Sequence, residues 1–341
     1  MPIVEYLIAD TFGTHIGKYS ERLKITQASE TLAQAPLLHL KSVLVLSRGV
    51  SISADALEAC AERGIPVFFI NGRGTAYAAL YAAGLTGTVL TRRAQLLAYY
   101  DRRGVAAALA MAAGKIHNQP ASLKYLAKTR KETDPEVYDA LHLGALDILD
   151  TLAALERLGE GTLDDLRAQI MAVEGQAARR YWAAVGAVLP PQYNWPGRDG
   201  RGATDPLNSM LNYGYGILYG LIEQAIVLAG LDPYAGFLHA DRSGKPSLVL
   251  DLIEEFRQVA VDRLVFGLAN RNFTVEQGDD GLLSTATRRA LAEKVLAHVD
   301  AGVRYEGKRY PLRWVMQNQA RALAGFLRGD RADYIAFKAG W

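Results

Sequence analysis

The spacing of apolar residues changes once along the chain, shortly before residue 88. Upstream, short β-branched or aromatic runs alternate with turn residues, which is typical of strands. We expect strands at 4–9, 22–26, 42–46 and 66–70. One helix is expected between Ser53, a favourable N-cap, and Gly64, a favourable residue just after a helix end.

Downstream, apolar residues recur every three or four positions, which predicts helices. Thr162 with Asp165, and Asp205 before a proline, have the spacing of helix caps. A tight hairpin is expected to turn at Glu306 and Gly307. The expected helices are 88–103, 105–131 (with Pro120 as a possible kink), 134–158, 162–188, 206–229, 248–270, 285–300 and 311–328. We therefore predict an α+β chain, with a small β-rich domain at 1–80 and a large all-α domain at 81–341.

Composition narrows the function only slightly. The chain has 341 residues and a net charge of +2, from 38 basic and 36 acidic side chains. That balance excludes a uniformly basic DNA-binding protein but allows a local basic face. Cys60 is the single cysteine, so no intramolecular disulfide or cysteine metal cluster can form, and we expect it to be buried.

No membrane or export signal is expected. The N-terminus lacks a positively charged region followed by an apolar run. The most apolar stretch, 211–230, contains Asn212, Glu223 and Gln224, so it reads as a buried helix rather than a membrane span. We expect a cytoplasmic protein.

Glu174 is the first candidate for chemistry. It lies four residues after Ile170, at the edge of the apolar stripe of its helix. A carboxylate there needs an ion partner or a metal. Gly175, unfavourable inside a helix by about 1 kcal/mol, predicts a close approach by another element. An ion pair with a neighbouring arginine would explain Glu174 equally well, the candidates being Arg167, Arg179 and Arg180.

A second acidic group lies in the apolar helix predicted at 248–270. Asp251 and Glu254 are three residues apart and so share one helix face, and His239 precedes them in a polar loop. Buried acids beside a histidine need a cation, and this donor set suits Mg²⁺ or Mn²⁺. A hydrogen-bonded core histidine remains the alternative for His239.

Weaker candidates surround these residues. Arg242 and Lys245, in the loop after His239, are possible phosphate contacts, as are the basic residues within 303–313. Asn208 and Asn212, four residues apart in a glycine-rich helix, are interpreted as polar contacts between packed helices.

Several segments together resemble one known family, the CRISPR-associated endonucleases/integrases of spacer acquisition. The similarity spans nearly the whole chain, and the joint order of the segments is more specific than any one of them. They are 50–53 (VSIS), 62–67 (ERGIPV), 115–119 (KIHNQ), 172–175 (AVEG), 205–214 (DPLNSMLNYG), 236–239 (GFLH), 248–257 (LVLDLIEEFR), 311–313 (PLR) and 319–321 (QAR).

The resemblance implies a catalytic metal site of Glu174, His239 and Glu254. Asp251 would lie nearby, as a support for these ligands or as a ligand to a second metal. The resemblance also implies a β-domain that dimerises and an assembly around a dimer of a small second adaptation protein. The implied reaction inserts double-stranded DNA fragments into a CRISPR repeat array, through attack of a 3′-hydroxyl on a phosphodiester.

Two other functions fit the same residues. A general metal-dependent nuclease of branched or single-stranded DNA would use water in place of the hydroxyl. A DNA-binding scaffold without catalysis would use the acids only to brace helices.

Overall fold

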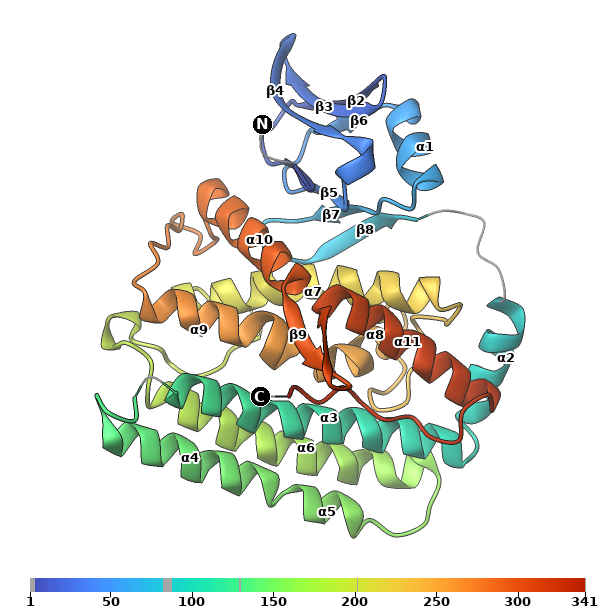
Figure 1. The fold of residues 1–341 in the computed structure, drawn as a ribbon, viewed down its shortest axis with the longest axis vertical. Coiled ribbons are helices and arrows are strands. Elements are labelled where there is room, and N and C mark those ends of the chain that lie inside the picture. Colours follow the sequence, from blue (N-terminus) through green and yellow to red (C-terminus); the bar gives the residue numbers. More distant parts are fainter. Residues whose placement is uncertain (1–3, 82–87, 129, 201, 341) are drawn as a thin grey trace.

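The computed structural model describes residues 4–81, 88–128, 130–200 and 202–340, and it confirms the α+β architecture (Figure 1). The β-rich part comes first. Its elements are β1 (Tyr6–Ala9), β2 (His15–Tyr19), β3 (Arg22–Gln27), β4 (Glu30–Pro36), β5 (Ser42–Val45), β6 (Ser51–Ile52), α1 (Ala54–Glu62), β7 (Val67–Ile70) and β8 (Ala76–Leu80).

Helices make up most of the remainder, with one hairpin between the last two. The elements are α2 (Thr88–Ala98), α3 (Arg102–Ala127), α4 (Pro135–Leu149), α5 (Leu152–Glu156), α6 (Leu163–Gly186), α7 (Pro206–Leu228), α8 (Ser247–Leu252), α9 (Arg263–Asn270), α10 (Thr285–Asp300), β9 (Gly302–Tyr305), β10 (Lys308–Pro311) and α11 (Leu312–Arg328). Among the described helices, none is long and apolar enough to cross a bilayer.

The first sheet has the order β1-β5-β7-β8, and its strands β1, β5 and β7 are buried on both faces. Alternate residues of a strand point to opposite faces. Leu7 and Val43 therefore join the core beneath the second sheet and α1, while Ile8, Leu44 and Phe68 join the core of the helical part. This double burial explains why these strands read as continuous apolar runs. The second sheet has the order β4-β3-β2-β6.

Most expected elements are confirmed, and the differences have local causes. The expected strands and the helix from Ser53 to Gly64 are present, but four strands were missed. β2, β4 and β6 are polar or contain glycine, and β8 is rich in alanine, which is uncommon in strands. The helix expected at 134–158 is divided between α4 and α5. Thr151 Oγ1 donates to the Ile148 carbonyl there, which competes with helical bonding.

The helices around α3 differ mainly at their ends. α2 ends at Ala98 rather than 103, since Asp101 caps a new helix by accepting from Arg103 N. α3 passes through Pro120 and ends at Ala127, and residue 129 of the expected 105–131 helix lies outside the described residues.

The helix expected at 248–270 is broken twice. After α8 the chain forms a 3₁₀ turn at Ile253–Glu255, then a π-helical turn at Gln258–Asp262, before α9 resumes regular geometry. Such departures often mark functional positions. Here Asp251 lies in α8, just before the first departure, and Glu254 lies within the 3₁₀ turn itself.

The two parts of the molecule meet in a glycine contact. The turn between β7 and β8 lies against α7, where a Cβ added at Gly216 would stand 1.3 Å from the Gly74 carbonyl oxygen. Gly74 itself has φ +82°, a conformation that suits glycine. Next to this contact, Arg73 and Thr75 of the turn line a cleft that is shared with the helical part.

We expect Gly216→Ala to destabilise the fold by about 2 kcal/mol or more, because backbone must move to admit the methyl group. Gly175→Ala is the matched control. An added Cβ there meets only Arg179 Nη1 at 3.8 Å, so alanine should stabilise α6 by up to about 1 kcal/mol. Urea unfolding followed by circular dichroism measures both. Equal stability of Gly216→Ala and the unmodified protein would contradict the tight contact.

Candidate functional site

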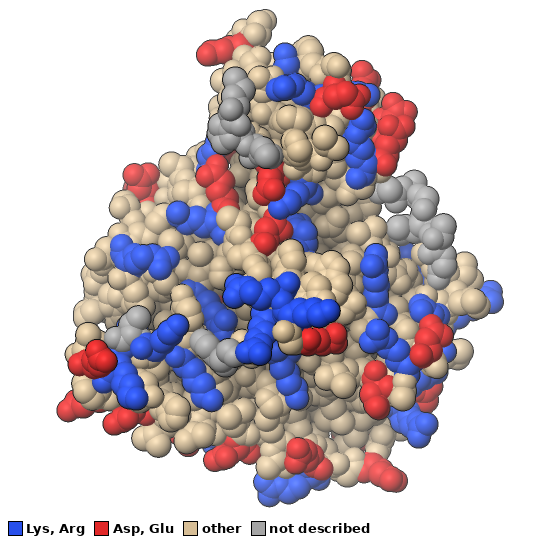
Figure 2. Space-filling model, viewed as in Figure 1, with Lys and Arg blue, Asp and Glu red and all other residues tan. Residues whose placement is uncertain are grey.

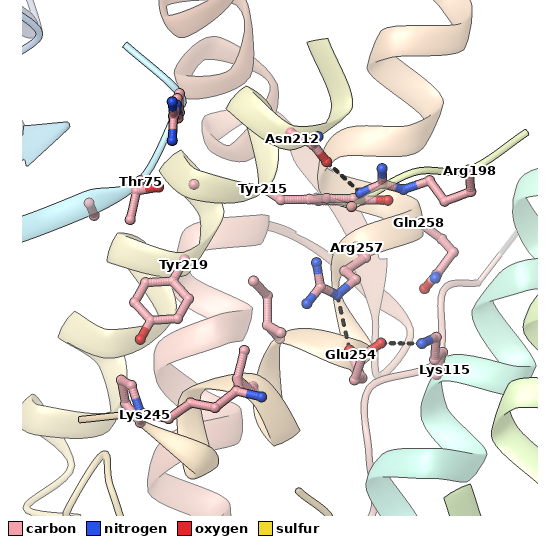
Figure 3. Close-up of a pocket in the computed structure, with 18 of the residues that line it drawn as sticks. Thr75, Lys115, Arg198, Asn212, Tyr215, Tyr219, Lys245, Glu254, Arg257 and Gln258 are labelled. Atoms are coloured by element: carbon pink, nitrogen blue, oxygen red, sulfur yellow. Dashed lines mark hydrogen bonds and ion pairs between the residues drawn. The ribbon is translucent and has the colours of Figure 1, made fainter. Parts of the chain in front are cut away.

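A cleft of about 790 Å³ lies between the β7–β8 turn and the helical part (Figure 3). Its walls come from α3, α7, the loop after Trp195 and the segment from Gly244 to Gln258. The charged side chains that line it are Arg73, Lys115, Arg198, Lys245, Glu254 and Arg257. Positive charge therefore surrounds a single lining carboxylate, which favours an anionic ligand.

Glu174 and Glu254 meet at this cleft through Lys115. The Lys115 ammonium contacts Glu174 Oε1 and lies 2.5 Å from Glu254 Oε2. The three side chains are largely buried, with exposed fractions of 16% for Glu174, 7% for Glu254 and 14% for Lys115. α6, the 3₁₀ turn and α3 each supply one of them. The structure thus brings together two of the three predicted metal ligands around one cation.

Electrostatics keep Glu254 ionised. Burial alone would raise the pKa of this carboxyl, but the charges of Arg257 and Lys115 lower that pKa to about 2. Arg257 Nε also donates to Glu254 Oε1 at 3.1 Å (Figure 3). The same carboxylates raise the pKa of Lys115 against the effect of burial. Glu254, Lys115 and Arg257 are therefore charged at neutral pH.

Asp251 holds the loop of His239. Its Oδ2 accepts from Phe237 N at 2.6 Å and Leu238 N at 2.9 Å, and its Oδ1 accepts from His239 N at 2.8 Å. His239 Nδ1 lies 2.8 Å from the same Oδ1. Both oxygens carry two such contacts, and Nε2 of His239 is left as the ring nitrogen available to a ligand.

Gly236 makes this arrangement possible, because a Cβ there would stand 2.7 Å from Asp251 Oδ2. Asp251 and Glu254 were expected on one helix face. In the structure they have different partners: Asp251 accepts from the backbone of 237–239, whereas Glu254 contacts Lys115 and Arg257.

The residues fit a divalent cation in chemistry. Glu174 Oε1 and Glu254 Oε2 are buried, and among the described residues neither accepts a hydrogen bond of normal geometry. Both instead face a positive charge. His239 is close enough to contribute to the lowered pKa of Glu254. Within the described ranges, no three His, Cys, Asp or Glu side chains are already arranged as a metal-binding group.

Arg198 forms the opposite wall of the cleft. Its Nη1 donates to Asn208 Oδ1 at 3.1 Å and its Nη2 to Asn212 Oδ1 at 2.7 Å. The guanidinium lies 5.3 Å from the centre of the Tyr215 ring, and Arg257 lies 4.7 Å from the same ring. The two asparagines, interpreted from sequence as contacts between helices, thus hold an arginine at the cleft.

Other expectations have mixed outcomes. The partner of Glu174 is Lys115, whereas Arg167 binds Asp164. Among the described residues, only the Arg179 side chain comes near an added Cβ at Gly175, at 3.8 Å, so no other part of the described protein makes the close approach expected there. Lys245 lines the cleft, whereas Arg242 is exposed and is not part of its lining.

Cys60 is buried as expected. Figure 2 shows Lys and Arg gathered over the β9–β10 hairpin, where Arg304, Lys308 and Arg309 are exposed.

Lys115 was missed as a site residue, although the sequence carries a signal for it. It lies four residues after Met111 and four before Gln119, both fully buried, so it belongs to the buried face of α3. A lysine at such a position needs acidic partners. Arg198 had no comparable signal, because it lies in an irregular loop, and its spacing of 10 and 14 residues from Asn208 and Asn212 follows no helix or strand period across that loop.

Comparison with known proteins identifies the family. The model of the family "CRISPR associated protein Cas1" matches residues 7–296. The chain belongs to the Cas1 family. It is 36% identical to the CRISPR-associated endonuclease Cas1 1 of Archaeoglobus fulgidus, over 98% of this chain and 99% of that protein.

Solved structures show the same fold. A casposase bound to its integration product superposes with a TM-score of 0.82 at 23% identity, covering 97% of this chain and 93% of the casposase. A chain of a Cas6-RT-Cas1–Cas2 complex gives 0.75 at 20% identity, covering 98% of this chain and 36% of that one.

Proposed function

We propose that this Cas1 protein is a metal-dependent DNA endonuclease/integrase that inserts short DNA fragments as spacers into a CRISPR array. One observation carries the proposal: two buried carboxylates, Glu174 and Glu254, face the Lys115 ammonium at the edge of a cleft whose other charged lining residues are all basic. The likeness to Cas1 endonucleases and to a casposase bound to its integration product supports the same reaction.

Glu174, His239 and Glu254 would hold the cation, which is Mg²⁺ or Mn²⁺ by its donor set. Lys115 would have to withdraw from the carboxylates, because it now occupies the position between them. Asp251 would support His239 rather than bind a second metal, since both of its oxygens are already engaged. When bound, the cation would lower the pKa of the attacking 3′-hydroxyl and offset charge on the phosphate.

The basic walls would hold double-stranded DNA, both the incoming fragment and the repeat. Arg198 and Arg257 both line the cleft and lie against the ring of Tyr215, and both can bind phosphate oxygens. Lys245 comes from the loop that follows His239. These contacts position DNA without reading its sequence.

We further propose a two-domain division at residues 80 and 81, with a homodimer formed through the β-rich domain. A dimer of the small second adaptation protein, Cas2, would join two such dimers, in keeping with the Cas1–Cas2 complexes among the structural neighbours. The proposed location is the cytoplasm, where a CRISPR array is accessible.

Glu254→Gln and Glu174→Gln should each reduce strand transfer by at least 100-fold, because an amide cannot supply the negative charge that a cation needs. The assay joins a labelled 3′-hydroxyl fragment to a plasmid carrying a repeat, in Mn²⁺. DNA binding without metal should persist. Mn²⁺ at 100 times its dissociation constant should stabilise the unmodified protein by about 2.7 kcal/mol, but not the variants.

Glu223→Gln is the control, a partly buried acid on α7 outside the cleft lining, and it should behave like the unmodified protein. Retained strand transfer in Glu254→Gln would refute the metal site. Degradation of DNA without joining would favour the general nuclease, and metal-independent binding without either reaction would favour the scaffold.

Lys245→Ala should weaken DNA binding and make the log–log dependence on salt shallower by about 0.9, the contribution of one neutralised phosphate. Arg242→Ala removes an equal charge from the same loop outside the cleft and should change the slope less. Fluorescence anisotropy with duplex DNA at several salt concentrations measures both. An unchanged slope for Lys245→Ala would remove it from the DNA surface.

The protein should scatter light at twice its protomer mass of 37.1 kDa at micromolar concentration. Leu38 in the β-rich domain is 86% exposed, so it is an apolar side chain that the proposed interface could cover. Leu38→Glu should therefore shift the protein toward monomer. Leu143→Glu, on α4 where leucine is 62% exposed, is the matched control and should stay dimeric. Equal dissociation of both variants would contradict an interface in the β-rich domain.

A further inference from the structure

The segment after α11 returns across the helical part. Following Gly329, residues 334–339 run back along α3 toward β9 (Figure 1). Tyr334, Ala336 and Phe337 are buried, while Ile335 is 72% exposed. The segment is thus held by one face, although it contributes no strand or helix of its own.

Glu255 binds this segment at two points. Its carboxyl group is fully buried, and Oε1 accepts from the Tyr334 hydroxyl at 2.5 Å while Oε2 accepts from Phe337 N at 2.7 Å. The ring of Phe337 stacks on Phe256, with centroids 5.2 Å apart and an interplanar angle of 9°. Glu255 and Phe256, two successive residues at the helix break, therefore both bind the segment.

Asn118 completes the attachment from α3. Its Nδ2 donates to the Glu255 carbonyl at 2.8 Å and to the Phe337 carbonyl at 2.9 Å, and its Oδ1 accepts from Ala339 N at 2.8 Å. Close packing reinforces these bonds, because a Cβ added at Gly114 would stand 2.8 Å from the Cβ of Ala336. We call Asn118, Glu255, Tyr334, Phe337 and Ala339 the clamp.

The clamp also satisfies the backbone of the helix break. In a regular α-helix the Glu255 carbonyl would accept from Val259 N. Here Val259 N donates to the Phe256 carbonyl instead, at 3.1 Å. A buried carbonyl without a partner would be costly, and Asn118 Nδ2 supplies the missing donor.

Two clamp residues are close in sequence to the charged residues Glu254 and Lys115 of the site. Glu255 follows Glu254 directly in the 3₁₀ turn, and Asn118 lies three residues after Lys115 on α3. No clamp residue lines the cleft. Its residues can therefore affect the chemistry only by fixing where Glu254 and Lys115 lie.

We propose that the clamp positions Glu254 for catalysis, by holding the helix break open and tying it to α3. Asn118 and Glu255 are then positioning residues that never touch DNA. This proposal rests on the proposed function, because it assigns Glu254 to the reaction.

Asn118→Asp is the main test. The carboxylate can still accept from Ala339 N but cannot donate to the two carbonyls. We expect kcat for strand transfer to fall at least tenfold, with KM for DNA within twofold of the unmodified value. Backbone amides of 253–260 should exchange hydrogen faster, since the break loses its donor.

Two further variants change the clamp less and should lower kcat less. Glu255→Gln should keep kcat within threefold, because its amide can accept from Phe337 N and donate to the Tyr334 oxygen. Tyr334→Phe removes a single bond, folds more readily than Asn118→Asp, and should lower kcat about threefold.

Val295→Ala is the control for lost stability. It truncates a fully buried residue of α10, outside the clamp and the cleft lining, and should leave kcat and exchange at 253–260 unchanged below its unfolding temperature. Equal loss of kcat in Val295→Ala and Asn118→Asp would overturn positioning in favour of general instability. Unchanged kcat in both Asn118→Asp and Tyr334→Phe would overturn the clamp alone, whereas an unmodified protein that joins no DNA would overturn the proposed function.

Discussion

The placement of two buried carboxylates beside one another constrains the rest of this structure. Glu174 and Glu254 come from elements 80 positions apart in sequence (254 − 174), and like charges at such proximity are unstable without a cation between them. Lys115 supplies that charge, and Arg257 supplies a second one on the other side of Glu254. The surrounding helices must therefore deliver four charged groups to one place while excluding water from most of their surface.

The two acids of the broken helix have different partners, so they do not compete for one cation. Asp251 accepts hydrogen bonds from the backbone of 237–239, whereas Glu254 contacts Lys115 and Arg257. Because the helix is broken, the Glu255 carbonyl lacks its regular helical donor, and the Asn118 side chain supplies a donor instead.

Sequence reasoning predicted the fold well because apolar period and caps act locally. The cap at Thr162 and Asp165, the cap at Asp205 and the turn at Glu306–Gly307 all appear as expected. The helix break was invisible, since residues 253–262 contain no proline or glycine to mark it. For the site, acids on apolar faces pointed to Glu174 and Glu254. The positions of Lys115, which joins them, and of Arg198 depend on contacts between separate segments, which the apolar period does not predict.

The contact between Gly74 and Gly216 has a consequence for larger assemblies. With backbone against backbone and no side chain between, the turn and α7 have no room to slide. If two chains were joined through their β-rich parts, the geometry of that junction would thus determine the relative position of the two clefts. The distance and the angle between the two clefts would then set the length of a duplex that spans both.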